Sequence, residues 1–522
     1  NKTILRLLEY NRITEILMSH CGSSLAQNLA SRLTPAESLE EADEKLETTE
    51  EALRVLATQN PPLGGIHDIK SAVERAKLGA ILELEDFVTI RETLDAAKQL
   101  KIFFRELDVL VDCDILREKA RSLEVLRNLT KKLYETIDEH GSIRDDATGE
   151  LLRIRRSIRA NELRIKEILQ GILHNSDNQK VFRETIVSMR GDRYVLPVRA
   201  EYRRSVPGIV HDQSATGSTL FIEPMAVVER NNEIKELMLA ELQEVNRILS
   251  SLSRDVAKET EIILENLNTM AFIDFSVACG KLARDMGATR PELNDKGITD
   301  IKQARHPLID RKVAVPIDIR LGDGYRLLLV TGPNTGGKTV SMKTLGLLSL
   351  MAQSGLFIPA ERGSRLSVYR EIYADIGDEQ SIEQNLSTFS AHMKHIVFIL
   401  RKATQDDLVL LDELGAGTDP AEGAALATAI LEELLKRESS VLATTHYSEL
   451  KTFAYKTAGV ENACVEFDVK TLRPTYRLLI GIPGASNAFA ISKRLGLDKS
   501  IIERASGFIK GDHARFEEVV AE

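Results

Sequence analysis

Residues 326–339 read Arg326-Leu-Leu-Leu-Val-Thr-Gly-Pro-Asn-Thr-Gly-Gly-Lys-Thr339, which is an apolar run, a glycine-rich loop and the start of a helical segment. The loop has the spacing G-x-x-x-x-G-K-[ST], in which small residues let backbone N–H groups close around phosphate oxygens at the positive end of a helix. Lys338 can then reach the β- and γ-phosphates of a nucleotide, and the Thr339 hydroxyl can bind Mg²⁺. The predicted strand Arg326–Thr331 and helix Thr339–Gln353 give the match its structural context. The sequence therefore predicts an ATP site with these members: Gly332, Pro333, Asn334, Thr335, Gly336, Gly337, Lys338, Thr339 and Val340.

A pair of acidic residues follows a second apolar strand, Leu408–Asp412. Asp412 comes at the carboxyl end of this strand, beside the phosphate loop, where it can hold Mg²⁺ directly or through water. Glu413 can polarise the attacking water. The alternative is a buried strand that ends in a solvated acidic pair, but the phosphate loop upstream favours the catalytic interpretation.

A histidine ends a third apolar strand, Val441–Thr445. His446 can donate a hydrogen bond to the γ-phosphate, although a histidine after a strand is usually just a polar strand end. The order and spacing of the three strands favour a functional role. The predicted catalytic residues are thus Lys338, Glu413 and His446.

Helical periodicity dominates the chain before Gly287, and apolar strands that alternate with helical segments dominate it afterwards. The 55 residues Met225–Cys279 contain neither Gly nor Pro, so a continuous helix there would extend roughly 80 Å. A small β module, with strands predicted at Glu184–Ser188, Arg193–Arg199 and Thr219–Glu223, lies between two long helices; the alternative is an ordinary elongated helical bundle. The predicted domains are a helical core at 1–140, an outgoing lever helix at 141–178, a β-containing clamp tip at 179–224, a returning lever helix and second half of the core at 225–290, and an α/β domain at 291–515.

Composition excludes several classes of protein. The chain has 522 residues and a net charge of −10, so any nucleic-acid contact must be a local basic patch rather than the whole surface. The four cysteines lie far apart and form no CxxC, which argues against a disulfide framework and against a zinc site. No run of 18 apolar residues and no signal-peptide pattern is present, so the expected location is the cytoplasm, without a membrane partner.

One local basic patch lies in the predicted tip. Between positions 180 and 204 there are seven basic and three acidic residues, with two tyrosines interleaved. This pattern suits contact with a phosphate backbone without reading of base sequence, and the alternative is a solvated hairpin with ordinary charges. The predicted nucleic-acid contacts are Lys180, Arg183, Arg190, Arg193, Arg199, Arg203 and Arg204.

Four motifs together resemble the nucleotide motifs of the MutS ATPases. They are Thr331–Thr339, Leu386-Ser387-Thr388-Phe389, Asp412-Glu413-Leu-Gly-Ala-Gly-Thr418 and Thr445-His446-Tyr-Ser-Glu-Leu450. The spelling is closer to the bacterial MutS-two branch than to mismatch-repair MutS. Its indicators are Thr339 after the lysine, Asp375-Ile-Gly-Asp-Glu-Gln380, and Thr418-Asp419-Pro420. The resemblance implies a split helical core with lever helices and a clamp, followed by an ABC-type ATPase domain.

The resemblance also carries expectations about partners within an ATPase dimer. Ser387 and Thr388 would contact the γ-phosphate in the partner subunit, so that Ser387 becomes catalytic in trans; the alternative is a Ser/Thr helix N-cap, with Ser390 as the nearer example. Asp419 would couple the two sites. Asn487 and Phe489 would belong to a helix-turn-helix that locks a homodimer.

Two cargoes agree with the resemblance. One is the ribosome, with a role in sensing and splitting collided ribosomes, and we favour it; the other is branched or recombining DNA. A non-enzymatic structural clamp of the SMC type is disfavoured because Glu413 is intact. The resemblance leaves no room for a mismatch-reading domain and leads us to expect a truncated chain, without the Smr nuclease domain that usually follows.

Overall fold

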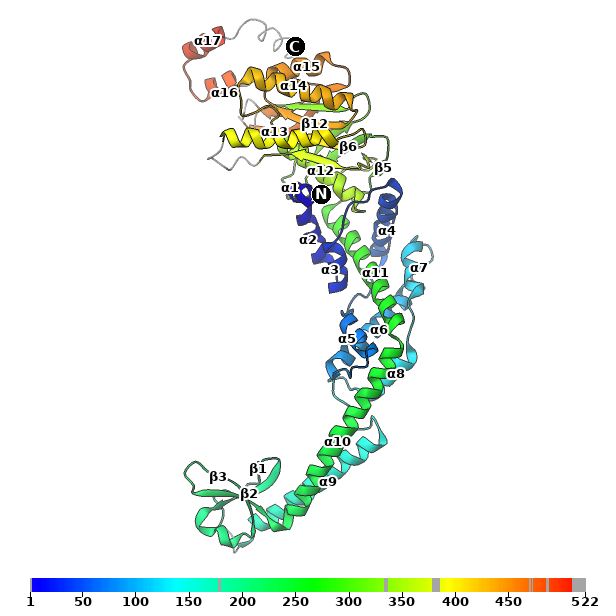
Figure 1. The fold of residues 1–522 in the computed structure, drawn as a ribbon, viewed down its shortest axis with the longest axis vertical. Helices are drawn as coiled ribbons and strands as arrows, with labels where there is room; N and C mark the ends of the chain where they lie inside the picture. Colours follow the sequence, from blue (N-terminus) through cyan, green and yellow to red (C-terminus); the bar gives the residue numbers. More distant parts are fainter. Residues whose placement is uncertain are drawn as a thin grey trace. The chain divides into compact units, whose positions relative to one another are not determined.

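A computed structural model of the chain describes residues 2–176, 180–332, 337–377, 385–468, 471, 473–484 and 488–508. The chain divides into two compact units. The first unit comprises Asn1–Gly64, Leu100–Ser122 and Thr269–Glu522, and the second comprises Gly65–Gln99 and Leu123–Asn268. Figure 1 labels the helices and strands of both units.

A six-stranded sheet in the order β10-β11-β12-β8-β13-β14 forms the centre of the first unit. Every neighbouring pair is parallel except β13 with β14. The strands are β8 (Leu327–Thr331), β10 (Ile372–Asp375), β11 (Leu408–Leu411), β12 (Ser440–Thr445), β13 (Val460–Asp468) and β14 (Arg473–Ile480). The strands predicted from the phosphate loop, the acidic pair and the histidine are therefore confirmed within one residue at either end.

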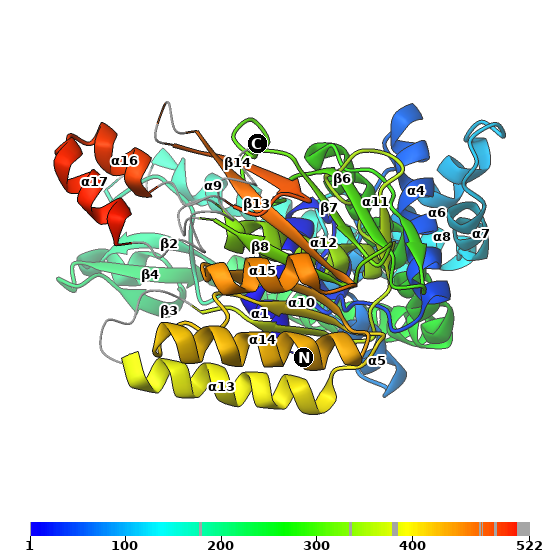
Figure 2. The same ribbon diagram turned by 90° about the horizontal axis from the view of Figure 1, so that it is seen from above.

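Side chains of β8 alternate between two hydrophobic cores. Leu328 and Val330 pack into the core that includes α12 (Lys338–Gln353). Leu327 and Leu329 pack into the core under α13 (Asn385–Lys402), α14 (Pro420–Lys436) and α15 (Ser448–Lys456). Figure 2 shows the sheet between these two groups of helices. Burial on both faces explains why the strands read as continuous apolar runs.

Further elements of the first unit surround this sheet. A four-stranded sheet has the order β5-β9-β6-β7. Its strands are β5 (Glu292–Asn294), β6 (Thr299–Ala304), β7 (Ile317–Leu321) and β9 (Arg365–Ser367). The remaining helices of this unit are α1 (Lys2–Leu7), α2 (Tyr10–His20), α3 (Ser24–Ser31), α4 (Leu39–Thr58), α7 (Asp114–Ser122), α16 (Ala488–Arg494) and α17 (Lys499–Gly507).

In the second unit, two long helices pack along each other and end in a β module (Figure 1). They are α9 (Gly149–Leu173) and α10 (Met225–Lys258). The β module is an antiparallel sheet in the order β1-β2-β4-β3. Its strands are β1 (Ser188–Arg190), β2 (Arg193–Arg199), β3 (Gly208–Gln213) and β4 (Thr219–Pro224). The unit also contains α5 (Lys70–Lys77) and α8 (Arg127–Thr136).

The β module shares one core with the ends of the two helices. Ile165 and Leu169 of α9, Leu196 of β2, Ile222 of β4 and Ile234 of α10 all belong to it. Their burial fixes the module on the helix pair, because removing this apolar surface from water is the main stabilising contribution to such a junction.

Two predictions of local structure are wrong. The segment Met225–Cys279 is not one helix, because Glu259, with φ −98° and ψ 9°, separates α10 from α11 (Thr260–Met286). The Glu259 N–H donates to the carbonyl of Val256, three residues back, and tightens the turn without any Gly or Pro. The predicted strand Glu184–Ser188 is displaced, since only Ser188 lies in β1.

Two helices cross the division between the units, α6 (Leu84–Glu106) and α11. Among the described residues, α11 is the one helix long and apolar enough to span a membrane by length and composition, and 61% of its most apolar window is buried inside the protein. Such burial is typical of a core helix.

Candidate nucleotide site

Among the described residues, those predicted to bind nucleotide lie at the carboxyl ends of β8, β11 and β12, here called the nucleotide edge. The parallel register places Thr331 beside Thr445, and Leu411 beside Ala443. Each strand therefore delivers the residue that follows it to the same edge. Ligands bind at this edge in open parallel sheets.

Lys338 begins α12 and is almost fully buried, with 2% of its surface exposed. Its ammonium donates to the carbonyl of Gly332 at 2.9 Å, across the phosphate loop. Burial lowers the pKa of Lys338, while the nearby carboxylates of Glu413 and Asp412 oppose that shift. A cation held in this way faces the loop that is predicted to surround phosphate.

Asp412 is held by two hydroxyl groups. Thr339 donates to Oδ2 at 2.7 Å, and Thr444 donates to Oδ1 at 2.5 Å. A hydroxyl and a carboxylate at this separation are hard oxygen donors of the kind that Mg²⁺ prefers. Thr339 and Asp412 therefore fit the predicted magnesium site, which they would share with phosphate oxygens.

Glu413 has left-handed backbone geometry, with φ 46°. For a non-glycine residue this conformation costs about 1–2 kcal/mol, and such strain concentrates at functional sites. The Glu413 N–H donates to the Thr444 hydroxyl at 2.8 Å, and the Leu414 N–H donates to the Thr444 carbonyl at 3.1 Å. The turn after Asp412 is therefore fastened to β12.

A cavity of about 280 Å³ opens beside the phosphate loop. One wall comes from α12 and the residue before it, through Gly337, Val340, Ser341 and Thr344. The rest of the lining comes from the segment 304–317 and from Tyr476 of β14. The side chain of Tyr476 lies close to Gly337, because a Cβ built on Gly337 would be 3.0 Å from a Tyr476 ring carbon. An apolar, aromatic-lined cavity beside a phosphate loop fits the flat ring of a nucleotide base.

The sequence did not reveal this cavity. Position 476 lies far from the phosphate loop in the sequence. The pairing of β13 with β8, and of β14 with β13, returns the chain to the sheet that carries this loop. The sequence also did not show the role of Arg305, whose guanidinium donates to the carbonyls of Arg311 and Ala314 and closes the loop that lines the cavity.

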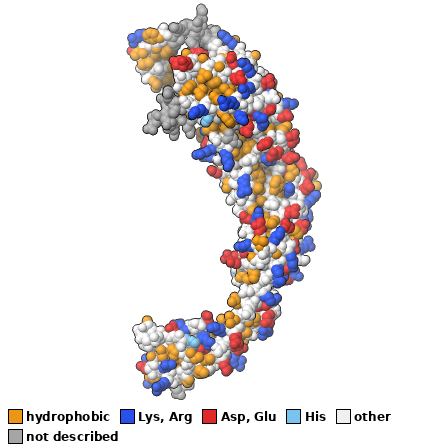
Figure 3. Space-filling view, in the orientation of Figure 1, with side chains coloured by type: hydrophobic (Ala, Val, Ile, Leu, Met, Phe, Trp, Pro, Cys, Tyr) orange, Lys and Arg blue, Asp and Glu red, His pale blue; other side chains and the backbone are white. Residues whose placement is uncertain are grey.

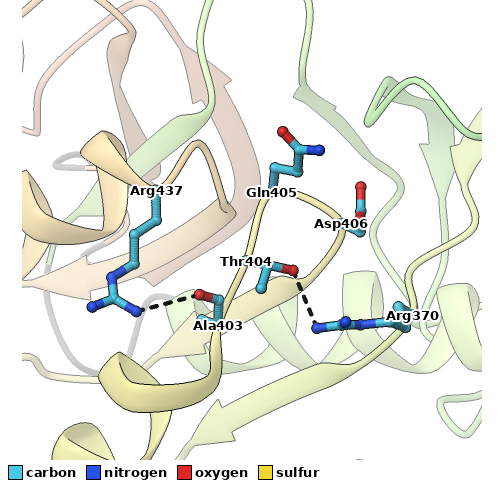
Figure 4. Close-up of a pocket in the computed structure, with 6 residues that line it drawn as sticks. All are labelled: Arg370, Ala403, Thr404, Gln405, Asp406 and Arg437. Atoms are coloured by element: carbon cyan, nitrogen blue, oxygen red, sulfur yellow. Dashed lines mark hydrogen bonds between the residues drawn. The ribbon is translucent and has the colours of Figure 1, made fainter.

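A second pocket lies at the amino ends of the strands and is not part of the nucleotide edge. Figure 4 shows Arg370 and Arg437 on opposite sides of it, with Thr404 between them. Arg370 is paired with the buried Asp407, and Arg437 is paired with Glu433. Both guanidinium groups therefore have partners inside the protein.

The remaining predicted site residues are placed as follows. His446 is exposed directly after β12, with its ring centroid 4.4 Å from that of Tyr447. Asp419 is the N-cap of α14, where its carboxylate accepts from the N–H groups of Ala421 and Glu422 at 3.0 and 3.2 Å. Ser390 lies inside α13 rather than at its start, so the N-cap alternative is wrong for this residue. Outside the described residues and side chains are Pro333, Asn334, Thr335, Gly336, Ser387, Thr388 and Asn487.

Known proteins match this chain along its whole length. The family described as MutS domain V matches residues 328–511. A protein named endonuclease MutS2 from Geobacillus sp. (strain WCH70) is 50% identical over 520 residues, which cover 99% of this chain and 66% of the relative. The chain belongs to the MutS2 family.

Other MutS2 relatives agree. The endonuclease MutS2 of Acetivibrio thermocellus is 48% identical over 522 residues, or 100% of this chain and 66% of the relative. That of Symbiobacterium thermophilum is 49% identical over 517 residues, or 99% of this chain and 65% of the relative. The chain thus spans slightly less than two thirds of the length of these MutS2 proteins.

The basic residues of the β module differ in whether they form ion pairs within the protein. Arg193 is paired with Glu223, whose side chain is fully buried, at 2.8 Å. Arg190 is paired with Asp212 and stacks on Phe221, with 3.8 Å between its guanidinium carbon and the ring centroid. By contrast, exposed positions are held by Lys180, Arg183, Arg199, Arg203 and Arg204.

Proposed function

We propose that this MutS2 chain hydrolyses ATP. The observation that carries the proposal is the position of Asp412, which is held between Thr339 of the phosphate-loop helix and Thr444 of β12, with the strained Glu413 next in the chain. The loop and Lys338 bind the phosphates. When present, Mg²⁺ neutralises phosphate charge at Thr339 and Asp412. Glu413 accepts the proton of the attacking water, and His446 donates to the γ-phosphate.

We propose that the adenine ring occupies the cavity beside α12. Tyr476 offers an aromatic face there, and Val340 contributes an apolar contact. In Tyr476→Ala the Kd for ATP should rise about 2- to 10-fold, since an aromatic stacking contact contributes about 0.5–1.5 kcal/mol. Binding of inorganic triphosphate should be unchanged, and an equal loss for both ligands would contradict this assignment.

We propose that the hydrolysing form is a homodimer. The pair α16 and α17 exposes an apolar surface (Figure 3). Its members are Phe489, Leu495, Leu497, Ile501 and Phe508, which are 37–85% exposed. Exposed patches of this kind mark protein–protein contacts. In the dimer, Ser387 and Thr388 complete the partner's site, and Asp419 couples the two sites.

The dimer proposal has a direct test in Ser387→Ala. This variant should bind ATP normally and lose hydrolysis, because the missing hydroxyl acts on the partner's nucleotide. Adding an excess of Lys338→Ala protein, whose own site is empty but whose Ser387 is intact, should restore part of the rate. A Ser387→Ala protein with full activity would rule out the shared site.

We propose that the β module grips a phosphate backbone, through its exposed basic residues, in the cytoplasm. Ribosomal RNA in a collided ribosome is the cargo we favour, and branched DNA is the alternative. Glu413→Ala protein should be trapped with ATP on its cargo, so co-sedimentation with ribosomes and binding to four-way DNA junctions at the same salt would separate the two. The nuclease activity in the name of the relatives would reside in the third of their length that this chain does not span.

A further inference from the structure

Thr444 is a buried residue that links two groups of the proposed reaction. Its side chain is inaccessible to solvent, with 0% of its surface exposed. Its hydroxyl lies 2.5 Å from Asp412 Oδ1 and 2.8 Å from the Glu413 nitrogen. The same oxygen therefore touches the magnesium ligand and the backbone of the base.

The protons of this arrangement can be assigned without ambiguity. The Glu413 N–H can only donate, and an ionised Asp412 carboxylate can only accept. The Thr444 hydroxyl must therefore accept from Glu413 and donate its single proton to Asp412. Serine can make the same two bonds, but valine and alanine can make neither.

The fold explains why position 444 has this place. Leu411 is in register with Ala443, so the next residues, Asp412 and Thr444, lie side by side. On its other side Thr444 is in register with Val330 of β8, the strand that leads into the phosphate loop. The residue thus sits between the strand of the acidic pair and the strand of the phosphate loop.

The two hydroxyl groups on Asp412 have different chemistry. Thr339 approaches Oδ2 and is itself a proposed ligand of the ion. Thr444 approaches the other oxygen, Oδ1, and is fixed from behind by the Glu413 N–H. The Thr444 bond can persist when the ion binds, so it sets the orientation in which Asp412 meets Mg²⁺.

We propose that Thr444 is a positioning residue, which orients the magnesium ligand Asp412 and the base Glu413 through one hydroxyl. The inference rests on the proposed ATPase function. A group that orients a metal ligand typically changes metal affinity or activity by about 10–100-fold when it is removed. A hydroxyl that only fills the core would instead change stability.

The test compares Thr444→Val, Thr444→Ala and Thr444→Ser in the full chain. Binding of a fluorescent, non-hydrolysable ATP analogue is titrated with Mg²⁺, and ATP hydrolysis is measured in parallel. We expect Thr444→Val and Thr444→Ala to require about 10-fold more Mg²⁺ for half-maximal binding and to lower kcat by about 10–100-fold. Binding in EDTA should stay within about twofold of the wild type, and Thr444→Ser should restore both properties.

Ser349→Ala is the matched control for loss of a buried hydroxyl. Ser349 lies in α12, is fully buried, and donates only to the carbonyl of Leu345 in its own helix. It should keep the magnesium dependence of the wild type. Thermal unfolding of each variant separates misfolding from a change at the site.

The outcomes distinguish this inference from the proposed function. A wild-type chain that hydrolyses ATP, together with Thr444→Val of normal rate and magnesium dependence, overturns the inference alone. If Thr444→Val and Thr444→Ala unfold, or if Thr444→Ser folds but stays inactive, the hydroxyl is not a positioning group. A wild-type chain that binds no nucleotide overturns the ATPase function and this inference with it.

Discussion

The nucleotide edge and the β module both gather charged residues around a sheet, but they use the charges differently. At the nucleotide edge, Lys338, Asp412 and Glu413 surround the place predicted for phosphate and the ion. In the β module, the buried carboxylate of Glu223 accepts from Arg193, His211 and Asn231, so these groups satisfy one another. We propose a phosphate ligand for the first arrangement, whereas the charged groups of the second pair with one another.

A local surplus of basic residues in the sequence therefore overstates the positive charge available to a partner. The positive balance counted between positions 180 and 204 includes Arg193 and Arg190, which are engaged with Glu223 and Asp212. The Arg193–Glu223 pair, whose carboxylate is fully buried, stabilises the fold only while both members are present, whereas the Arg190–Asp212 pair is exposed to solvent. Substitutions in either region test whether its charged groups serve a ligand or pair inside the protein.

Glu413→Ala should separate catalysis from binding at the nucleotide edge. Loss of a general base costs about 10²–10⁴-fold in rate, so kcat should fall by about 10³-fold. The Kd for ATP should change less than about threefold, because phosphate contacts supply most of the binding. Steady-state hydrolysis and equilibrium titration measure the two quantities, and a variant that keeps half of the wild-type rate would exclude Glu413 as the base.

Lys338→Ala should weaken ATP binding by about 100-fold or more. A hydrogen bond from a charged donor contributes about 1.5–3 kcal/mol, and the ammonium faces several phosphate oxygens. Lys338 is buried, so a matched control is Lys343→Ala on the same helix, whose ammonium instead lies 3.7 Å from Glu9. Isothermal titration should show normal affinity for the control; equal losses for both variants would point to damage of α12.

Arg193→Ala should destabilise the β module by about 3 kcal/mol, because it leaves the buried carboxylate of Glu223 without its main partner. Arg203→Ala is the matched control, since this arginine is exposed and should leave stability within about 0.5 kcal/mol. Chemical denaturation followed by hydrogen exchange in β2 and β4 would measure both. If the two variants were equally stable, the Arg193–Glu223 pair would not stabilise the β module.

Arg203→Ala should instead change binding to a nucleic acid. If Arg203 neutralises one phosphate of duplex DNA, its removal should make the slope of log K against log salt shallower by about 0.9. Arg193→Ala, assayed at a temperature where it is folded, should keep the wild-type slope. A titration series at several salt concentrations tests this, and the reverse ranking would show that Arg193 binds the phosphate.

The smallest expected effect is a pH dependence of the stability that Glu244 of α10 contributes. Hydrogen bonds from Arg247 and Thr148 lower the pKa of Glu244 from its ordinary value of 4.5 to about 2. A depressed pKa stabilises the folded state above pH 4.5, and this contribution disappears as the pH falls toward 2. The difference in unfolding free energy between wild type and Glu244→Gln should therefore be present at pH 6 and shrink below pH 4. A difference that grew with acid would have the wrong sign.

The sequence predicted which residues come together at one edge of the sheet, because these residues follow regular elements. Each of Lys338, Asp412 and His446 lies within one residue of the end of a strand or the start of a helix, and parallel strands bring such residues together. Tyr476 could not be found in this way, because its place depends on how β14 pairs with β13. The break at Glu259 also has no local signal, since the helical apolar spacing continues through it.

Roles that depend on side-chain partners were the hardest to predict. Arg193 and Arg203 are equivalent in a count of charges, and only burial of Glu223 distinguishes them. In the sequence Thr444 is one residue of an apolar strand that ends before His446, and nothing there shows the two hydrogen bonds that connect it to Asp412 and Glu413. Functions carried by Ser387 and Thr388 still rest on the family resemblance.

The alternation of β8 between two cores restricts how this strand could move during the proposed ATP cycle. A shift of β8 by one residue would turn Leu327 and Leu329 into the space of Leu328 and Val330, and the packing of the strand against both cores would break. The strand is therefore expected to keep its register rather than slide along its neighbours. The described residues that flank the phosphate loop are Gly332 and Gly337, whose φ values of 139° and 97° lie in the region that favours glycine. In the proposed ATP cycle, a change at the nucleotide would therefore reach the rest of the unit through α12 and the turns, while the sheet keeps its register.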